Sequence, residues 1–493
     1  MRFEDYRRYD GLGLAQLVAR GEVSASELVE AALARADAVE PRLHALVARM
    51  DEAARAAARQ PVAGPFGGVP FLVKDLFQEC RGEPSWAGSR ALQRAAPKSA
   101  QDSEIVARWR AAGLIVAGRT SLPELGIKGV TEPEAFGPTR NPWNPAHSPG
   151  GSSGGSGAAV AAGVVPLAGA NDGGGSIRIP GAWCGLFGFK PGRGRTPLGP
   201  SCPDALGGLV VNHVLTRSVR DSAAALDATQ GPAASSLVHL APPPRPYLDE
   251  AATEPGALRI AFATDSPIGT EVHREAIEAV ARTARLLEGL GHRVEEAAPA
   301  IDGMRMAQDF LQIWFAQCAG SVERVRKLGG SDDGLEFDTR LLAALGRALR
   351  ASDYVPSQLR CAACMPVLAE FFGRYDLWLT PAVAMPPPRI GEIATPAHER
   401  LATRIMLALG LGRALLQSSL VRKLVQDNLR WVPFTQLANL TGLPAMSVPL
   451  HWTPDGLPIG AQFTAPIGGE GLLFRLAGQL ERAQPWFDRV APG

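Results

Sequence analysis

Two clusters rich in glycine and serine contain the hydroxyl groups best placed to act as nucleophiles. The first covers residues 148–157 with the sequence SPGGSSGGSG, and the second covers residues 171–176 with the sequence NDGGGS. Ser176 follows three consecutive glycines, whose backbones can turn sharply and present several N–H groups to one point. An oxyanion hole requires such N–H groups, because negative charge develops on a carbonyl oxygen that a hydroxyl attacks. The second cluster therefore predicts a serine nucleophile at position 176.

A serine nucleophile needs a base, and Lys74 is the lysine whose surroundings suit that task. Only six of the 50 basic residues are lysines, and Lys74 follows the apolar run Phe71-Leu72-Val73. Burial among such neighbours favours the neutral form of a lysine, which can accept a proton. The competing interpretation is a surface lysine paired with Asp75.

Other interpretations of the two clusters stay open at this level. Glycine and serine runs are typical of flexible linkers. The sequence G-x-S-x-G fits around both Ser152 and Ser153, and this motif marks the nucleophile of α/β-hydrolases. That motif needs a strand directly before it, yet prolines interrupt the preceding segment. His398 and His451 would be the candidate histidine partners. A phosphate-binding loop is disfavoured because no G-x-x-x-x-G-K-[ST] sequence is present.

An alternation of helices and strands must position these residues, which indicates an α/β layered fold. Helices are predicted over 28–40, 102–113, 271–291 and 471–483, and 303–372 reads as mostly helical. Apolar runs of strand length are predicted at six places: 67–77, 114–118, 258–265, 377–383, 445–450 and 459–465. We expect the helical region 303–372 to cover the site.

Three segments together resemble the amidase signature family. They are GGVP at 67–70 followed by Lys74-Asp75, GGSSGGSGAAVAAG at 150–163, and NDGGGSIRIPGAWCGLFGFKP at 171–191. The resemblance covers most of the chain and is weakest between about 231 and 375. It implies an amidase-signature fold, with a central mixed twisted β-sheet flanked by helices. It also implies a single domain over 1–493, a signature core over 65–200 and a variable, mostly helical segment over 231–375 that covers the site.

The resemblance implies a Ser-cisSer-Lys triad. Ser176 would be the nucleophile, Ser152 the bridging serine on a cis peptide bond, and Lys74 the base. The remaining implied roles are an oxyanion hole from the backbone amides of Gly173, Gly174, Gly175 and Ser176, and a supporting layer of Ser153, Asp172 and Arg178 around the glycine loop.

Departures from the common pattern indicate a branch of the family. This chain reads Asn171-Asp172-Gly173 where many members have Thr-Asp-Thr or Thr-Asp-Ile, so Gly173 removes a side chain near the acyl-binding region. The sequence NDGGGSIRIP is similar to the branch that contains 6-aminohexanoate-cyclic-dimer hydrolases and aryl-acyl amidases. In that branch a cysteine lines the substrate pocket, and Cys318 falls at the matching place.

Composition and charge limit the binding partners and the cellular location that we expect. The formal net charge of +1 over 493 residues offers no field that would attract nucleic acid or an acidic membrane. No uninterrupted apolar stretch is long enough to span a membrane, and the charged N-terminal sequence has no signal-peptide pattern, so a cytoplasmic enzyme is expected. The resemblance implies no cofactor and no metal, and either a monomer or a homodimer.

The predicted function is an amidohydrolase that acts through a serine acyl-enzyme on small linear or cyclic amides. Their acyl groups are expected to be apolar or aryl, with carbamates and esters as further substrates. The alternative is the A-type subunit of a tRNA-dependent amidotransferase, which acts only in a multi-subunit complex. Such subunits typically continue Ser-Ile-Arg-Gln-Pro, whereas this chain has Ser176-Ile177-Arg178-Ile179-Pro180.

Overall fold

The computed structural model describes all residues except 397, 399, 401–411, 418–425, 428 and 493. Its central feature is a mixed sheet with the strand order β1-β3-β2-β4-β6-β5-β10-β11-β9-β7-β8. The strands are β1 (Leu46–Arg49), β2 (Pro70–Lys74), β3 (Ile115–Thr120), β4 (Leu167–Asp172), β5 (Phe187–Lys190), β6 (Val211–Thr216), β7 (Arg259–Phe262), β8 (Arg293–Glu296), β9 (Leu377–Pro381), β10 (Ala445–Trp452) and β11 (Pro458–Thr464). The predicted central mixed sheet is therefore confirmed.

Strand β2 carries the candidate base at its carboxyl end. It lies parallel to β3 on one side and to β4 on the other. All five of its residues are buried, as expected for a strand covered on both faces, and this explains the continuous apolar sequence Pro70-Phe71-Leu72-Val73. The backbone pairing of β2 with β4 is limited to Leu72 and Ala168, so the two strands are no longer paired at the candidate base Lys74.

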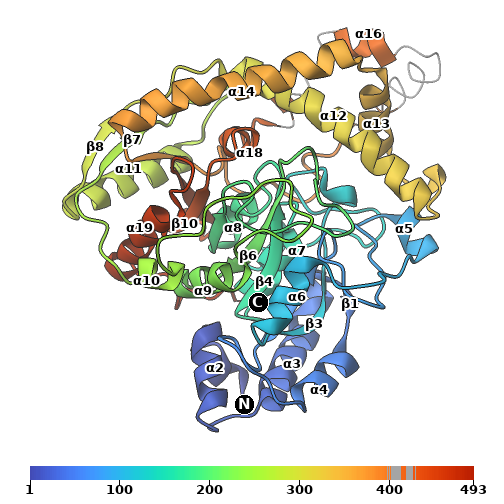
Figure 1. Ribbon diagram of the computed structural model, residues 1–493, viewed down its shortest axis with the longest axis vertical. Coiled ribbons are helices and arrows are strands. Elements are labelled where there is room, and N and C mark those ends of the chain that lie inside the picture. Colours follow the sequence, from blue (N-terminus) through green and yellow to red (C-terminus); the bar gives the residue numbers. More distant parts are fainter. Residues whose placement is uncertain (397, 399, 401–411, 418–425, 428, 493) are drawn as a thin grey trace.

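Helices pack around this sheet, and β8 lies at its outer edge (Figure 1). Those in the first half are α1 (Phe3–Tyr6), α2 (Gly11–Ala19), α3 (Ala25–Leu43), α4 (Asp51–Ala58), α5 (Arg90–Ala95), α6 (Glu104–Ala111), α7 (Gly154–Ala161), α8 (Arg178–Cys184) and α9 (Val219–Thr229). Those in the second half are α10 (Tyr247–Ala251), α11 (Arg274–Gly289), α12 (Gly303–Lys327), α13 (Phe337–Ala348), α14 (Ala351–Arg374), α16 (Gly412–Gln417), α18 (Gln436–Leu440) and α19 (Glu470–Ala483). Two short 3-10 turns, η1 (Glu124–Gly126) and η2 (Asp332–Gly334), complete the described elements.

The predicted helical region 303–372 is confirmed as α12, α13 and α14. These helices lie together at the top of Figure 1, opposite the N-terminal helices α2, α3 and α4. Helix α12 packs against α13, α14 and α18. Among the described residues, no helix has the length and apolar character needed to cross a membrane.

The glycine and serine clusters are ordered and buried, so the linker interpretation is wrong. Every residue from Ser148 to Gly157 is buried, and α7 begins inside the first cluster at Gly154. Small residues are needed there because the helix passes close to the sheet: a Cβ at Gly155 would lie 2.4 Å from the backbone nitrogen of Ser121.

Candidate active site

Lys74 ends β2 with its side chain fully buried among three oxygen atoms. Its Nζ lies 2.8 Å from Ser152 Oγ, 3.0 Å from Ser153 Oγ and 2.7 Å from Asn171 Oδ1. Lys74 does not pair with Asp75, whose carboxylate instead accepts from Arg119 Nε at 2.7 Å. The interpretation of Lys74 as a surface lysine is therefore wrong.

Burial lowers the pKa of Lys74 well below its ordinary value, although the charge of Asp172 partly opposes that shift. The surrounding hydrogen bonds indicate which of the three oxygen atoms around Lys74 Nζ can donate a proton to it. Asn171 Nδ2 donates to the Leu76 carbonyl oxygen, which orients Asn171 Oδ1 toward Lys74 as an acceptor. Ser153 Oγ donates to the Asn171 carbonyl oxygen, so it too accepts from Lys74. The contact between Lys74 Nζ and Ser152 Oγ fits an N–H donor on the charged amine; in the neutral form, which has two N–H donors and one lone pair, the lone pair is left for the Ser152 hydroxyl.

The peptide bond between Gly151 and Ser152 is cis, as the resemblance implies. Ser152 is 2% exposed and the following residue is tied to the nucleophile, because the Ser153 N–H donates to the Ser176 carbonyl oxygen at 3.3 Å. The structure therefore brings Lys74, Ser152 and Ser176 into one buried centre. Ser176 remains 8% exposed.

The glycine loop before Ser176 presents backbone N–H groups, but one of them is already used. The Gly175 N–H donates to Asp172 Oδ1 at 2.7 Å, which differs from its expected place in the oxyanion hole. The N–H groups of Gly173, Gly174 and Ser176 have no acceptor among the described residues. These three amides are therefore the free donors beside the nucleophile.

An ion pair between Asp172 and Arg178 stabilises the glycine loop. Arg178 Nε and one terminal nitrogen donate to the two oxygens of Asp172, each at 3.0 Å, and both side chains are fully buried. Burial alone would raise the pKa of Asp172, but the charge and hydrogen bonds of Arg178, the charge of Lys190 and a hydrogen bond from Asn439 together keep it below its ordinary range. Asp172 also accepts from the N–H groups of Gly175 and Ile177. The ion pair thus fixes the backbone on both sides of Ser176.

Several residues that complete this network were not assigned from the sequence. Arg178 also donates to the Thr435 carbonyl oxygen, to Asn439 Oδ1 and to Gln462 Oε1. Thr435 Oγ1 donates to the Gly174 carbonyl oxygen at 2.7 Å. These side chains lie in the segments PFTQLANLTGLP and LPIGAQF. The resemblance, which covers most of the chain, extends to those segments and was a signal for a functional role, but pattern alone could not connect them to Arg178.

A cavity of about 130 Å³ opens onto Ser176 and is bounded by segments near 125–130 and 429–436 and by the cover helices. Helix α12 supplies Phe310, Leu311, Trp314 and Phe315, and α13 supplies Leu341 and Leu342. The other apolar walls are Ile179, Trp183, Ile393, Leu429, Trp431 and Val432. Because Ser176 faces an apolar, aromatic cavity, this space has the lining of a site for an apolar or aromatic group.

Cys318 does not line this cavity, which corrects the expectation. It is 2% exposed in a buried cluster with Ala91, Leu92 and Val322, and its Sγ faces the Thr339 carbonyl oxygen. Its neighbours on α12, Trp314 and Phe315, occupy the cavity wall instead. The match to the family in this region is loose. Cys318 lies about one helical turn after Trp314 and Phe315, the residues of α12 that contact the cavity.

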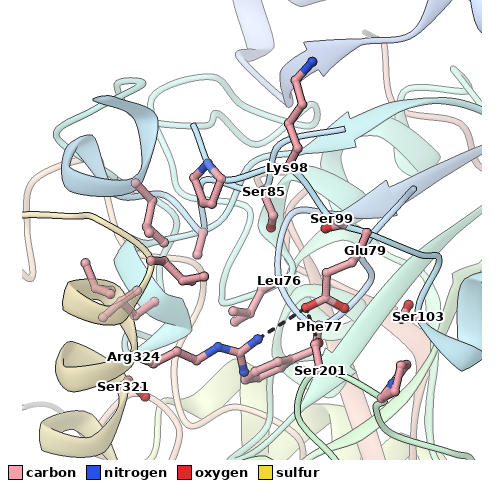
Figure 2. Close-up of a pocket in the computed structure, with 18 of the residues that line it drawn as sticks. Leu76, Phe77, Glu79, Ser85, Lys98, Ser99, Ser103, Ser201, Ser321 and Arg324 are labelled. Atoms are coloured by element: carbon pink, nitrogen blue, oxygen red, sulfur yellow. Dashed lines mark hydrogen bonds and ion pairs between the residues drawn. The ribbon is translucent and has the colours of Figure 1, made fainter. Parts of the chain in front are cut away.

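A second and larger cavity of about 330 Å³ lies beside the catalytic centre (Figure 2). Leu76 and Leu125 form part of its wall, and a Cβ at Gly126 would lie 2.8 Å from Leu76 Cδ2 and 3.3 Å from Ser152 Oγ. Glu79 also lines this cavity. Its carboxylate accepts from Ser201 Oγ at 2.9 Å and lies 3.7 Å from Arg324. Ser176 does not line this cavity, so the cavity that contains the nucleophile is the candidate substrate site.

The α/β-hydrolase interpretation is not supported. No described strand leads into residues 150–154. His451 Nε2 pairs with Glu275 at 2.8 Å and His398 is exposed, whereas Ser152 is contacted by Lys74. In the part of the chain that is described, no cluster of His, Cys, Asp or Glu has the makeup of a metal site.

Comparison with known proteins identifies the class. The model of the amidase family matches residues 27–474, so the chain belongs to that family and is an enzyme that hydrolyses amides. It is 36% identical to the 6-aminohexanoate-cyclic-dimer hydrolase of Pseudomonas sp. (strain NK87), over 97% of this chain and 96% of the relative. A solved structure of 6-aminohexanoate cyclic dimer hydrolase complexed with substrate is 34% identical, with a TM-score of 0.89 and 99% of each chain covered.

A bacterial aryl acylamidase of the amidase signature family is also similar in structure. It is 26% identical, with a TM-score of 0.85, and the match covers 98% of this chain and 99% of that chain. The predicted family and fold are therefore confirmed, together with the prediction of an amidase. The amidotransferase alternative is not favoured by these relatives.

Proposed function

We propose that this chain hydrolyses linear or cyclic amides with apolar or aryl acyl groups through an acyl-enzyme on Ser176. The observation that carries this proposal is the contact of 2.8 Å between Lys74 Nζ and Ser152 Oγ beside a nucleophile that opens onto an apolar cavity. The similarity to a cyclic-dimer hydrolase and an aryl acylamidase supports the same substrate class. Carbamates and esters, which share the carbonyl and leaving-group arrangement, are proposed as further substrates.

In the first half of the reaction, neutral Lys74 takes the proton of Ser152 as Ser152 takes the proton of Ser176. The Ser176 oxygen attacks the amide carbonyl, and the N–H groups of Gly173, Gly174 and Ser176 bind the resulting oxyanion. Ser152 then passes the proton from Lys74 to the amide nitrogen, the C–N bond breaks, and an ester on Ser176 remains. In the second half, water attacks that ester and releases the acid.

The test is the hydrolysis of 4-nitroanilides of acetate, hexanoate and benzoate by the purified protein. We expect wild type to prefer the hexanoyl and benzoyl compounds, and Ser176→Ala to lose nearly all activity. Ser153→Ala serves as a milder comparison, because the Ser153 hydroxyl accepts from Lys74 and donates to the Asn171 carbonyl oxygen but takes no part in the proposed proton relay. Full activity in Ser176→Ala would refute the mechanism, and a preference for acetate would refute the acyl specificity.

The same assay separates the hydrolase from an amidotransferase subunit. A subunit of that kind would show little hydrolysis alone and would copurify with its partners. Turnover by the isolated chain excludes that alternative.

A further inference from the structure

The substrate cavity is mostly apolar, and its charged side chains lie together at one place on its wall. Among the described residues that line it, Lys128 and Asp338 carry the charges. Lys128 Nζ lies 2.5 Å from Asp338 Oδ2, and the two side chains are 28% and 14% exposed. The pair is thus reachable from the cavity, in contrast to the fully buried pair of Asp172 and Arg178.

The pair has unused hydrogen-bonding capacity on both members. Asp338 accepts from Lys128 through one oxygen and from Thr395 Oγ1 at 3.1 Å through the other, and a carboxylate has about four lone-pair sites. An ammonium has three donors. Lys128 directs one to Asp338 and lies 3.9 Å from Glu336, so a donor remains for another acceptor.

The backbone of Lys128 also lies next to the segment that carries Ser152. The Lys128 carbonyl oxygen lies 2.8 Å from where a Cβ on Gly151 would be, directly before Ser152 in the chain. Ser176 lines the same cavity. A substrate whose acyl group fills this space therefore extends along a wall that offers one charged donor and one charged acceptor.

A donor next to an acceptor complements an amide group, which has a carbonyl oxygen and an N–H. We propose that Lys128 and Asp338 bind a second amide of the substrate, so that this enzyme selects diamides, linear or cyclic, over monoamides of similar apolar size. This inference rests on the proposed function and names the substrate class of the same site. Lys128 would donate to the carbonyl oxygen of the second amide, and Asp338 would accept from its N–H.

The experiment compares two series of 4-nitroanilides with wild-type protein. One series carries plain alkanoyl groups, and the other carries ω-acetamidoalkanoyl groups with two to six methylenes between the carbonyls. We expect one spacer length to give a kcat/KM about tenfold above that of its plain counterpart. This is the gain expected from about one hydrogen bond to a charged group. A ratio near one for every spacer would overturn the proposal without any variant being needed.

Variants then assign the preference to the pair. Lys128→Met and Asp338→Asn should each bring the diamide-to-monoamide ratio close to one at the preferred spacer. Lys98→Met and Asp333→Asn are matched controls outside this cavity and should keep the wild-type ratio. An unchanged ratio in both pair variants would overturn the proposal. If the proposed function itself fails, Ser176→Ala will hydrolyse both series as fast as wild type does, or neither protein will hydrolyse them.

Discussion

Asn171 contacts Lys74 more closely than either serine does. Its Oδ1 lies 2.7 Å from Lys74 Nζ, against 2.8 Å for Ser152 Oγ and 3.0 Å for Ser153 Oγ. Asn171 stands where many family members have threonine, and its amide oxygen lies directly against the Lys74 amine. It offers an acceptor without adding a negative charge.

Replacing Asn171 with aspartate should therefore raise the pKa of Lys74. A negative charge within about 4–6 Å favours the charged form of its neighbour and shifts a pKa by about 1–3 units. The acidic limb of the kcat/KM profile should move to higher pH by at least about one unit. Asn171→Leu, which removes the acceptor without adding charge, is the control. A profile that stays in place in Asn171→Asp would contradict this role.

Activity of the wild type should rise with pH and then level off. Burial lowers the pKa of Lys74, and the neutral amine is the active form, so activity is lost as pH falls through that lowered pKa. The measurement is kcat/KM for a 4-nitroanilide from pH 5 to 9. Residual activity in Lys74→Ala should lack this limb. If the same limb persists in that variant, another group titrates.

Removal of the Asp172 charge should destabilise the protein. Asp172→Asn leaves Arg178 buried without its carboxylate, and breaking such a pair costs about 3–5 kcal/mol. The free energy of unfolding in urea at pH 7 measures this loss. Since the pKa of Asp172 is lowered in the folded state, its stabilisation is present above pH of about 4, the ordinary range of aspartate, and declines as pH falls further.

The matched control for this substitution is Asp333→Asn, because Asp333 is exposed and its pair with Arg94 lies on the surface. We expect a change within about 0.5 kcal/mol there. Equal losses in the two variants would show that the buried pair has no special role.

Gln78 should position the base. Its Oε1 accepts from the Lys74 N–H at 2.7 Å and its Nε2 donates to the Ala170 carbonyl oxygen at 3.1 Å, which bridges β2 and β4 beyond their last paired residues. We expect Gln78→Leu to lower kcat about tenfold, since an interaction worth about 1.4 kcal/mol corresponds to that factor. KM should change little because Gln78 does not line the substrate cavity.

Steady-state kinetics of Gln78→Leu beside Gln60→Leu, an exposed glutamine, check this expectation. A rise in KM at constant kcat would assign Gln78 to substrate binding instead.

Local sequence was enough to propose Ser176 and Lys74 as reacting residues, and the resemblance to the family added Ser152. Lys74, Ser152 and Ser176 lie within short motifs, and the strands β2, β3, β7, β9, β10 and β11 follow apolar runs of ordinary composition. Strand β4 was not predicted, because its sequence LAGAND is small and polar and has low β propensity. It is a strand because its neighbours β2 and β6 pair with it.

What could not be predicted depends on contacts between distant segments. The use of the Gly175 N–H by Asp172 follows from the conformation of one loop, with Gly175 at a φ of +129°. The position of Cys318 depends on which element packs against each part of the buried face of α12, and the sequence pattern of the helix does not specify that packing. Lys128 and Asp338 are 210 residues apart and meet only through the packing of α13 near the 125–130 segment.

The hydrogen bonds of Arg178 have a consequence for synthesis of the protein. Its partners Thr435, Asn439 and Gln462 follow it by 257, 261 and 284 residues. At translation rates of roughly 5–20 residues per second, the nascent nucleophile loop waits roughly 10–60 s for them on the ribosome. During that interval the Arg178 guanidinium has the Asp172 carboxylate as an acceptor but lacks the three late ones. The catalytic motifs emerge early, but they mature into a working centre only after the late segment has been translated.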